Sequence, residues 1–152
     1  MPVARRSLTV SAPTDAVWAL VADPHHLPRW WPDVARVEDV QPDRWTEVYV
    51  TRKGRAVRAD YNLLESEAPG PGGDPPGRRV WAQELAGTPF ERVLAESVTE
   101  LVLEPDGDRT LITLLKRQRL RGASRAGGGF LLRRATREKL TEALEGIERA
   151  VG

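Results

Sequence analysis

Apolar and polar residues follow two different periods along the chain, and these predict its first elements. Residues 4–11 alternate between polar and apolar side chains, which predicts a strand. A short helix follows, because Pro13 suits its first position, Asp15 suits its positively polarised start, and Pro24 prevents its continuation. A second short helical or turn-like piece is predicted for residues 25–31, HHLPRWW. Neither piece would be stable alone, so we expect both to fold against a sheet.

From residue 35 onward the apolar period changes to two, and six further strands are predicted. Their ranges are 35–40, 45–52, 55–66, 79–86, 91–104 and 109–121, separated by turns rich in Gly, Pro and Asp. Residues 68–77, APGPGGDPPG, have no apolar anchor and predict a mobile loop. Residues 122–129, GASRAGGG, end the last strand and precede a helix.

The C-terminal segment predicts one long amphipathic helix over roughly residues 130–150. Its apolar stripe consists of Leu132, Thr136, Leu140, Ala143, Leu144, Ile147 and Val151. Consecutive strands with short turns form an antiparallel meander, so this order of elements predicts the α+β class. We expect the long helix to cover the inner face of a curved sheet.

Length and composition predict a single domain over residues 1–152, with no linker or internal repeat. Cysteine is absent, which excludes disulfides and thiolate sites and fits a reducing compartment. No run approaches the roughly 18 apolar residues that cross a bilayer. The start, MPVARR, lacks the apolar core of a signal peptide. We therefore expect a cytoplasmic domain without stable membrane insertion.

The formal net charge of +1 conceals an uneven distribution. Residues 1–115 carry 13 Lys and Arg against 18 Asp and Glu, whereas residues 116–152 carry 10 against 4. A basic C-terminal quarter can meet an anionic ligand, a membrane surface or nucleic acid, or it can be a solvated face. Phe130 is the only aromatic residue beyond residue 90, so basic and aromatic residues do not interleave there, and we expect no nucleic-acid partner.

Motifs of metal, phosphate and hydrolase chemistry are missing from the sequence. His25 and His26 are the only histidines, and adjacent histidines followed by Leu-Pro give poor metal-ligand geometry. The chain has no Gly-x-Ser-x-Gly, and the triple glycine at 127–129 lacks the Gly-Lys-Ser/Thr of a phosphate loop. We therefore predict no metal and no cofactor, and no catalytic residue is assigned.

Three segments resemble the START-type helix-grip superfamily (SRPBCC), and most closely its polyketide cyclase/dehydrase-like branch. They are SAPTDAVWALVADPHHLPRWWPDV at 11–34, WAQELAGTPFERVL at 81–94, and RTLITLLKRQRLRG at 109–122 with the helix that follows. The resemblance implies a seven-stranded antiparallel sheet curved around the C-terminal helix, with two short helices between strands 1 and 2. It also implies a cavity for an apolar small molecule such as a lipid or polyketide, but no single chemistry.

Two adjacent tryptophans, Trp30 and Trp31, raise a question about this cavity. Neighbouring side chains point in different directions on a helix or a strand, so both indoles can hardly enter the same core. One indole would then seal the core while the other borders the cavity mouth, or both would serve packing. The sequence does not show which applies, or which indole does which.

Strand alternation predicts which residues line the inner wall. In 93–103 one face is apolar at its ends and small in the middle, which would leave space opposite a helix; it carries Val93, Ala95, Ser97, Thr99, Leu101 and Leu103. In 109–121 the face with Ile112, Leu114, Lys116 and Gln118 is expected inward, in agreement with the family resemblance. An inward Lys116 would need an anion, such as a carboxylate or a ligand's acid group, or it would reach water at the rim.

Together these residues define the expected ligand site. Its predicted members are Trp30, Trp31, Tyr61, Trp81, Ser97, Thr99, Leu101, Ile112, Leu114, Lys116, Gln118, Thr136 and Leu140. The favoured function is binding of an apolar, optionally acidic, lipid-like or polyketide-like molecule in this cavity. The alternative is a polyketide cyclase/dehydrase-type enzyme acting in the same cavity, with Lys116, Gln118 and Tyr61 as its polar groups. The ligand, any partner protein and the oligomeric state are not readable from the sequence.

Overall fold

Residues 3–122 and 128–152, which the computed structural model describes, form seven strands and three α-helices. The strands are β1 (Val3–Val10), β2 (Val34–Gln41), β3 (Arg44–Val50), β4 (Ala56–Glu67), β5 (Gly77–Gln83), β6 (Leu94–Asp106) and β7 (Arg109–Leu120). The helices are α1 (Thr14–Val21), α2 (Leu27–Trp30) and α3 (Gly128–Val151), with short 3₁₀ turns at Pro24–His26, Pro71–Gly73 and Pro89–Arg92.

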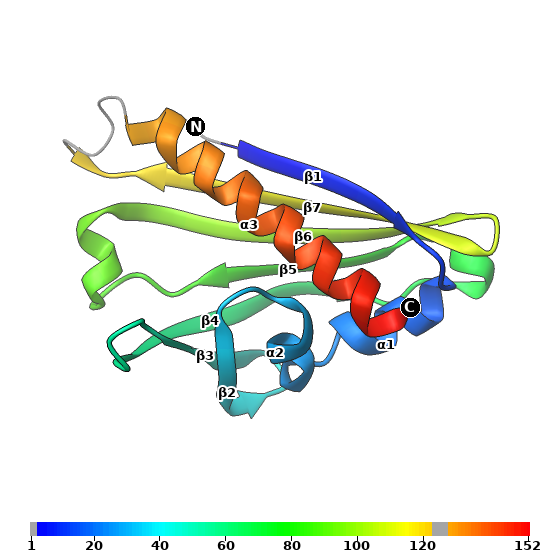
Figure 1. The fold of residues 1–152 in the computed structure, drawn as a ribbon, viewed down its shortest axis with the longest axis horizontal. Helices are drawn as coiled ribbons and strands as arrows, with labels where there is room; N and C mark the ends of the chain where they lie inside the picture. Colours follow the sequence, from blue (N-terminus) through cyan, green and yellow to red (C-terminus); the bar gives the residue numbers. More distant parts are fainter. Residues whose placement is uncertain (1–2, 123–127) are drawn as a thin grey trace.

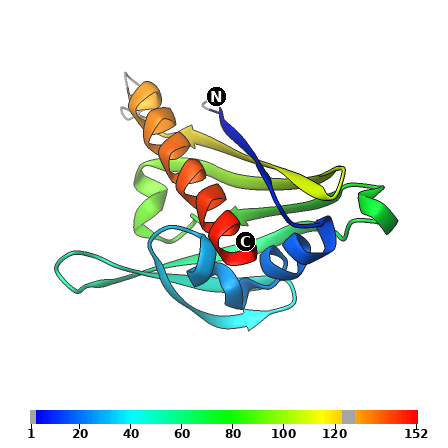
Figure 2. The same ribbon diagram turned by 45° about the vertical axis from the view of Figure 1, so that its right-hand side comes forward.

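All seven strands belong to one antiparallel sheet in the order β1-β7-β6-β5-β4-β3-β2. Strands β2 to β7 form a meander of neighbours, and β1 joins at the β7 edge, so the first and last strands lie side by side. Figures 1 and 2 show α3 lying across one face of the curved sheet, with α1 and α2 beside its C-terminal end. The expected α+β helix-grip architecture, with two short helices between the first two strands, is confirmed.

The loop between β4 and β5 differs from the expected mobile loop without an anchor. Gly73 is buried and lies against Pro105, and Gly77 lies against Pro69 and the Trp18 indole. Gly73 has a positive φ of 87°, which favours glycine, and a Cβ there would come 2.9 Å from the Pro105 ring. Packing of glycine and proline residues therefore anchors this segment. Large apolar residues, the usual sequence signal of an anchored loop, are absent from it.

The core lies between α3 and the middle of the sheet. On α3, Leu140, Ala143 and Ile147 are fully buried, as the predicted apolar stripe requires. They belong to one core cluster with the fully buried leucine and isoleucine side chains of β6 and β7, which are Leu101, Leu103, Ile112 and Leu114. The C-terminal part of α3 is thus fixed to the sheet by apolar packing.

Contact between α2 and α3 depends on a single glycine. Gly146 faces the backbone of Trp30, and a Cβ at this position would lie 2.3 Å from the Trp30 carbonyl oxygen and 2.9 Å from its Cα. Real Cβ contacts do not come that close, and a backbone cannot move aside as a flexible side chain can. Gly146 therefore sets how closely the tryptophan-bearing segment approaches α3.

We expect Gly146→Ala to destabilise the protein although alanine favours helix formation. The helix gains about 1 kcal/mol from the substitution, whereas overpacking against a backbone that cannot move aside costs about 2–3 kcal/mol, the upper part of the usual range. The net loss, about 1–2 kcal/mol, can be measured by urea unfolding. Glu145→Ala, at the exposed neighbouring position, is the control and should change stability by less than about 0.5 kcal/mol. A Gly146→Ala protein as stable as the wild type would contradict the close packing.

Candidate functional site

A pocket of about 250 Å³ opens between the first half of α3 and the inner face of the sheet. Its lining comes from the segment after α2, from β3, from β7 and from α3. The residues are Trp31, Pro32, Asp33, Tyr49, Lys116, Gln118, Ala135, Thr136, Lys139 and Leu140. The volume lies just below the roughly 300–1,000 Å³ of typical small-molecule sites, so the pocket suits a small ligand or one end of a larger one.

The two adjacent tryptophans occupy different environments. The Trp30 indole is buried in the core with 3% of its surface exposed, whereas Trp31 is partly exposed and lines the pocket. The Trp31 ring meets Trp30 edge to face at 5.5 Å between centroids and Trp81 at 6.4 Å. Pro32, which follows Trp31, also lines the pocket. Trp31 therefore forms an aromatic end wall, held in place by the buried indoles behind it.

Two cations line the pocket, Lys116 from β7 and Lys139 from α3. The Lys116 Nζ lies over the Trp31 ring, 5.7 Å from the ring centroid, in cation–π geometry. Burial lowers the pKa of Lys116, and the charge of Glu47 opposes that shift. Among the ion pairs within 4.0 Å in the described part of the chain, none involves Lys116. A partly buried ammonium without a close carboxylate favours an anion in the pocket.

Behind the pocket wall a buried carboxylate, Glu47, is held by two aromatic donors. The Trp45 indole N–H donates to Glu47 Oε2 at 3.0 Å, and the Tyr49 hydroxyl donates to Oε1. The Tyr61 hydroxyl lies 3.3 Å from that of Tyr49. Glu47 is only 2% exposed, so Tyr49, which lines the pocket, connects this carboxylate to the pocket interior.

Burial raises the pKa values of Glu47, Tyr49 and Tyr61, which form one hydrogen-bonded cluster. Burial raises the pKa of Glu47, although the hydrogen bonds from Tyr49 and Trp45 and the charge of Lys116 favour the ionised form. Burial also raises the pKa values of Tyr49 and Tyr61, and the neighbouring Glu47 charge adds to both shifts. Both phenols thus stay protonated and act as hydrogen-bond donors.

A buried arginine supports the cluster from β5. The Arg79 guanidinium lies over the Trp45 ring, 5.6 Å from its centroid, and donates to Ser66 Oγ at 3.1 Å. Burial lowers the pKa of Arg79, and the charge of Asp23 opposes this. The Trp45 ring also stacks on Tyr61, with 6.0 Å between centroids and 10° between planes. This layer fixes the indole that donates to Glu47.

Two contacts bridge the pocket from α3. The Thr136 hydroxyl donates to Gln118 Oε1 at 2.9 Å, which joins the helix to β7. The Lys139 ammonium meets Asp33 Oδ2 at 2.6 Å, which joins the helix to the segment that carries Trp31. The Asp33 pair raises the pKa of Lys139. Since the Lys139–Asp33 pair is exposed, it positions the rim more than it stabilises the fold.

The structure brings together only part of the residues expected to line a cavity. Five of them line the pocket: Trp31, Lys116, Gln118, Thr136 and Leu140. The others lie in the interior outside this lining: Trp30, Tyr61, Trp81, Ser97, Thr99, Leu101, Ile112 and Leu114. The pocket thus lies at the first half of α3, while the other expected residues are packed in the interior.

Sequence reasoning missed Tyr49, a polar residue of the pocket lining, and Glu47, the buried carboxylate behind it. They alternate with outward residues on β3, in the order Trp45, Glu47, Tyr49. A strand face made of two aromatic residues around one carboxylate was the available signal. It indicates an inward carboxylate with aromatic hydrogen-bond donors on either side.

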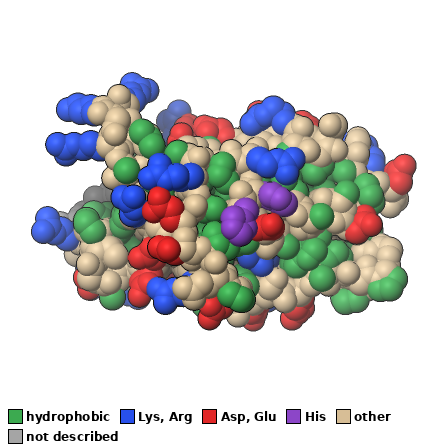
Figure 3. Space-filling view, turned by 90° about the horizontal axis from the view of Figure 1, so that it is seen from below, with side chains coloured by type: hydrophobic (Ala, Val, Ile, Leu, Met, Phe, Trp, Pro, Cys, Tyr) green, Lys and Arg blue, Asp and Glu red, His purple; other side chains and the backbone are tan. Residues whose placement is uncertain are grey.

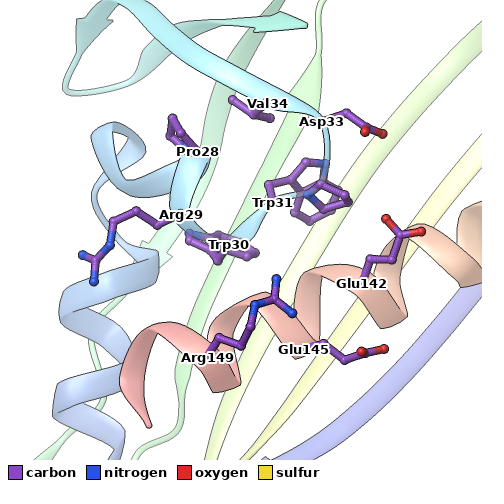
Figure 4. Close-up of a pocket in the computed structure, with 10 residues that line it drawn as sticks. Pro28, Arg29, Trp30, Trp31, Asp33, Val34, Glu142, Glu145 and Arg149 are labelled. Atoms are coloured by element: carbon purple, nitrogen blue, oxygen red, sulfur yellow. The ribbon is translucent and has the colours of Figure 1, made fainter. Parts of the chain in front are cut away.

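Two other hollows on the surface lie away from Lys116 and from the Tyr49–Glu47 pair. A groove of about 360 Å³ runs beside the pocket between α2 and α3, and Figure 4 shows charged side chains of α3, Glu142, Glu145 and Arg149, along it. A larger hollow of about 550 Å³ lies at loops that include Pro69–Gly72 and Pro105. Neither groove nor hollow contacts Lys116 or the Tyr49–Glu47 pair.

The basic end of the molecule is the projecting start of α3. Figure 3 shows Lys and Arg side chains gathered there, at the upper left of the view. Arg134 Nε lies 3.8 Å from Glu138 Oε1, the i,i+4 pair that the sequence allows, and both side chains are exposed. Both histidines make hydrogen-bond contacts just after α1. His25 Nδ1 lies 2.9 Å from Asp23 Oδ1, and His26 Nδ1 lies 3.0 Å from the Leu20 carbonyl oxygen.

Within 3–122 and 128–152, no group of three or more His, Asp and Glu side chains is placed to hold a metal ion. In the same part of the chain no helix has the length and apolar character of a membrane span.

Comparison with solved structures identifies the fold as START-like helix-grip. A START superfamily protein from Mycobacterium smegmatis aligns with a TM-score of 0.74 at 12% identity, covering 99% of this chain and 97% of that one. The ZhuI aromatase/cyclase from Streptomyces sp. R1128 aligns with a TM-score of 0.73 at 15% identity, covering 98% and 92%. One half of the di-domain aromatase/cyclase BexL, from the BE-7585A biosynthetic pathway, aligns with a TM-score of 0.69 at 24% identity, covering 97% of this chain and 47% of that one.

A family model described as polyketide cyclase / dehydrase and lipid transport matches residues 1–152. The chain belongs to this family. A search of the curated proteins found no match.

The two tryptophans should contribute differently to stability. We expect Trp30→Ala to lower the free energy of unfolding by about 3–5 kcal/mol, because it leaves a cavity in the core. Trp31→Ala should cost only about 1–2 kcal/mol, because the pocket already adjoins this ring. Urea unfolding of the two variants measures both values. Equal losses, or a larger loss for Trp31→Ala, would contradict the assignment of Trp30 to the core and Trp31 to the pocket.

Proposed function

We propose that this protein binds an apolar small molecule, lipid-like or polyketide-like, that carries an acid group. The apolar part would lie between the Trp31 ring and Leu140, and the acid group would meet Lys116. The observation that carries the proposal is the Lys116 ammonium, partly buried at the pocket and without a carboxylate at ion-pair distance in the described chain. Membership of a family described in part by lipid transport supports the apolar character of the ligand.

The division of the pocket into an apolar and a polar side supports an amphipathic ligand. Trp31, Pro32 and Leu140 offer apolar surface, while Lys116, Gln118 and Tyr49 offer polar atoms. Small-molecule sites commonly combine such an apolar lining with a few polar groups that fix the orientation. The modest volume implies that a long apolar chain would extend from the pocket toward solvent or displace the rim.

A simple amphiphile pair tests this proposal: decanoate, which has an acid group, and decanol, which does not. We expect Lys116→Met to weaken decanoate binding by about tenfold or more, since a hydrogen bond to a charged group contributes about 1.5–3 kcal/mol. Decanol binding should stay within about twofold of the wild type. Isothermal titration calorimetry measures both affinities.

The control for this experiment is Arg117→Met, which removes a positive charge from the neighbouring, exposed position of β7. It should leave decanoate binding unchanged. Absence of decanoate binding to the wild type, or equal weakening by Lys116→Met and Arg117→Met, would contradict the proposal.

An enzyme of cyclase/dehydrase type is the second candidate function. It is supported by the convergence of Glu47, Tyr49 and Lys116 at one pocket with displaced pKa values. Mass spectrometry of a poly-β-keto thioester incubated with the protein discriminates the two functions, because cyclisation with dehydration releases water whereas binding alone leaves the mass unchanged. Conversion that persists unaltered in Lys116→Ala and in Tyr61→Phe would exclude both residues from such chemistry.

A further inference from the structure

We propose that the pocket takes up a proton together with an anionic ligand, and that Glu47 is the group that receives it. The acid group of the ligand pairs with Lys116, and the protonated Glu47 passes a hydrogen bond to the ligand through the Tyr49 hydroxyl. The inference rests on the proposed function, because it concerns the same pocket.

The hydrogen-bond partners of Glu47 fit an ionised carboxylate in the free protein. Oε2 lies within hydrogen-bond distance of the Trp45 indole N–H, and Oε1 of the Tyr49 hydroxyl. Two donors suit an ionised carboxylate, which can only accept. In this form the Tyr49 hydrogen points at Glu47, and Tyr49 presents only an oxygen lone pair to the pocket and to Tyr61. An anion would find an acceptor there instead of a donor.

The charged and titratable groups around Glu47 come from four strands. Tyr49 lies on its own strand β3, Tyr61 on β4, Arg79 on β5 behind the Trp45 ring, and Lys116 on β7. At the rim, Lys139 and Asp33 pair with each other. Lys116 is thus the cation whose charge acts on Glu47, and a ligand anion would compete for the same ammonium.

A ligand anion beside Lys116 would place two negative charges around one positive charge in a poorly hydrated site. Burial of this kind strongly disfavours an uncompensated charge, and a carboxyl group usually responds by taking up a proton. Burial already raises the pKa of Glu47. Protonation is therefore the change that restores charge balance with the least movement.

Protonation also reverses the hydrogen bond between Glu47 and Tyr49. The new carboxyl O–H donates to the Tyr49 oxygen, and the Tyr49 hydrogen turns toward the pocket and donates to the ligand. Trp45 continues to donate to Oε2. One proton arrives from solvent, no covalent bond of the ligand changes, and the floor of the pocket changes from an acceptor to a donor.

The direction of the pH dependence follows from linkage. Ligand raises the pKa of Glu47 in the complex above its value in the free protein, so binding takes up a proton at pH values between the two. Decanoate affinity should therefore rise as the pH falls through this range, by up to about tenfold per pH unit. Decanoate itself stays ionised above about pH 6, because free carboxyl groups titrate near about 4–5.

Calorimetry in buffers of different ionisation heat measures the protons taken up per decanoate bound, from about pH 6 to about pH 9. Decanoate binding to the wild type should take up a proton at pH values between the pKa of Glu47 in the free protein and its pKa in the complex, and decanol binding should take up none. Glu47→Gln, which keeps the shape of the side chain and both acceptor and donor capacity, should bind decanoate with little proton uptake. Far-UV circular dichroism confirms that the variant is folded.

The outcomes separate this inference from the proposed function. If the wild type binds no decanoate, both fail. If it binds decanoate without proton uptake, or if Glu47→Gln takes up as many protons as the wild type, binding stands and the role of Glu47 is overturned. Uptake that survives in Glu47→Gln and disappears in Lys116→Met would assign the proton to Lys116 instead.

Tyr49→Phe provides a second, independent readout. The variant removes one of the two hydrogen bonds that favour the ionised form of Glu47. The lower pH limit of proton uptake, which the pKa of Glu47 in the free protein sets, should therefore move upward relative to the wild type. A lower limit that stays in place or moves downward would show that the Tyr49 hydroxyl is not coupled to the proton-accepting group.

Discussion

The uneven packing of α3 against the sheet is the constraint on which the rest of this structure depends. Along its second half the helix presents Ala143, Leu144 and Ile147 to the core cluster that includes the aliphatic side chains of β6 and β7. Along its first half it faces Lys116 and Gln118 instead. Dry packing on one half positions the helix firmly enough to keep a polar pocket open under the other.

Aromatic residues connect the packed half to the open half. Trp30 lies in the core and is pressed against α3 at Gly146, while its neighbour Trp31 ends the pocket. Trp81 supports Trp31 from β5. A pair of consecutive tryptophans thus serves two purposes because consecutive side chains point to different sides of the chain. Rigid rings are suited to this task, since they provide a large contact area with few rotatable bonds.

The buried carboxylate of Glu47 gives the pocket its chemical character. A group of this kind is costly to bury, and the structure compensates with two aromatic donors and the nearby charge of Lys116. An apolar residue at this position would fit a pure core better. The presence of an ionisable cluster that one wall residue, Tyr49, connects to a pocket is the arrangement expected of a site that binds or transforms a polar group.

Most of the fold could be predicted from the sequence, whereas the site could be predicted only in part. Strand alternation placed Ser97, Thr99 and Leu101 on the inner face of β6, and the stripe on α3 was identified residue by residue. Periodicity shows which face is inward, but not whether facing side chains meet. For that reason Leu101, Ile112 and Leu114 were expected to line the ligand site, whereas in the structure they are fully buried.

The missed residues have physical explanations as well. A glutamate such as Glu47 is normally predicted to be solvated. Its burial is compensated by hydrogen bonds from Tyr49 and Trp45 on the same strand and by the charge of Lys116, which is far away in the sequence. The packed loop around Gly73 reads as mobile, because glycine and proline carry no conventional apolar signal. In both cases the decisive contacts depend on how the chain folds in three dimensions.

The most direct test of this account is a titration of isotope-labelled protein with decanoate, followed residue by residue by nuclear magnetic resonance. The account predicts that shift changes concentrate at the pocket, on Trp31, Lys116, Gln118 and Thr136, and leave the packed residues Leu103 and Ile112 nearly unchanged. Changes concentrated instead at the loop hollow near Gly70 and Pro105, or no changes at all, would contradict it.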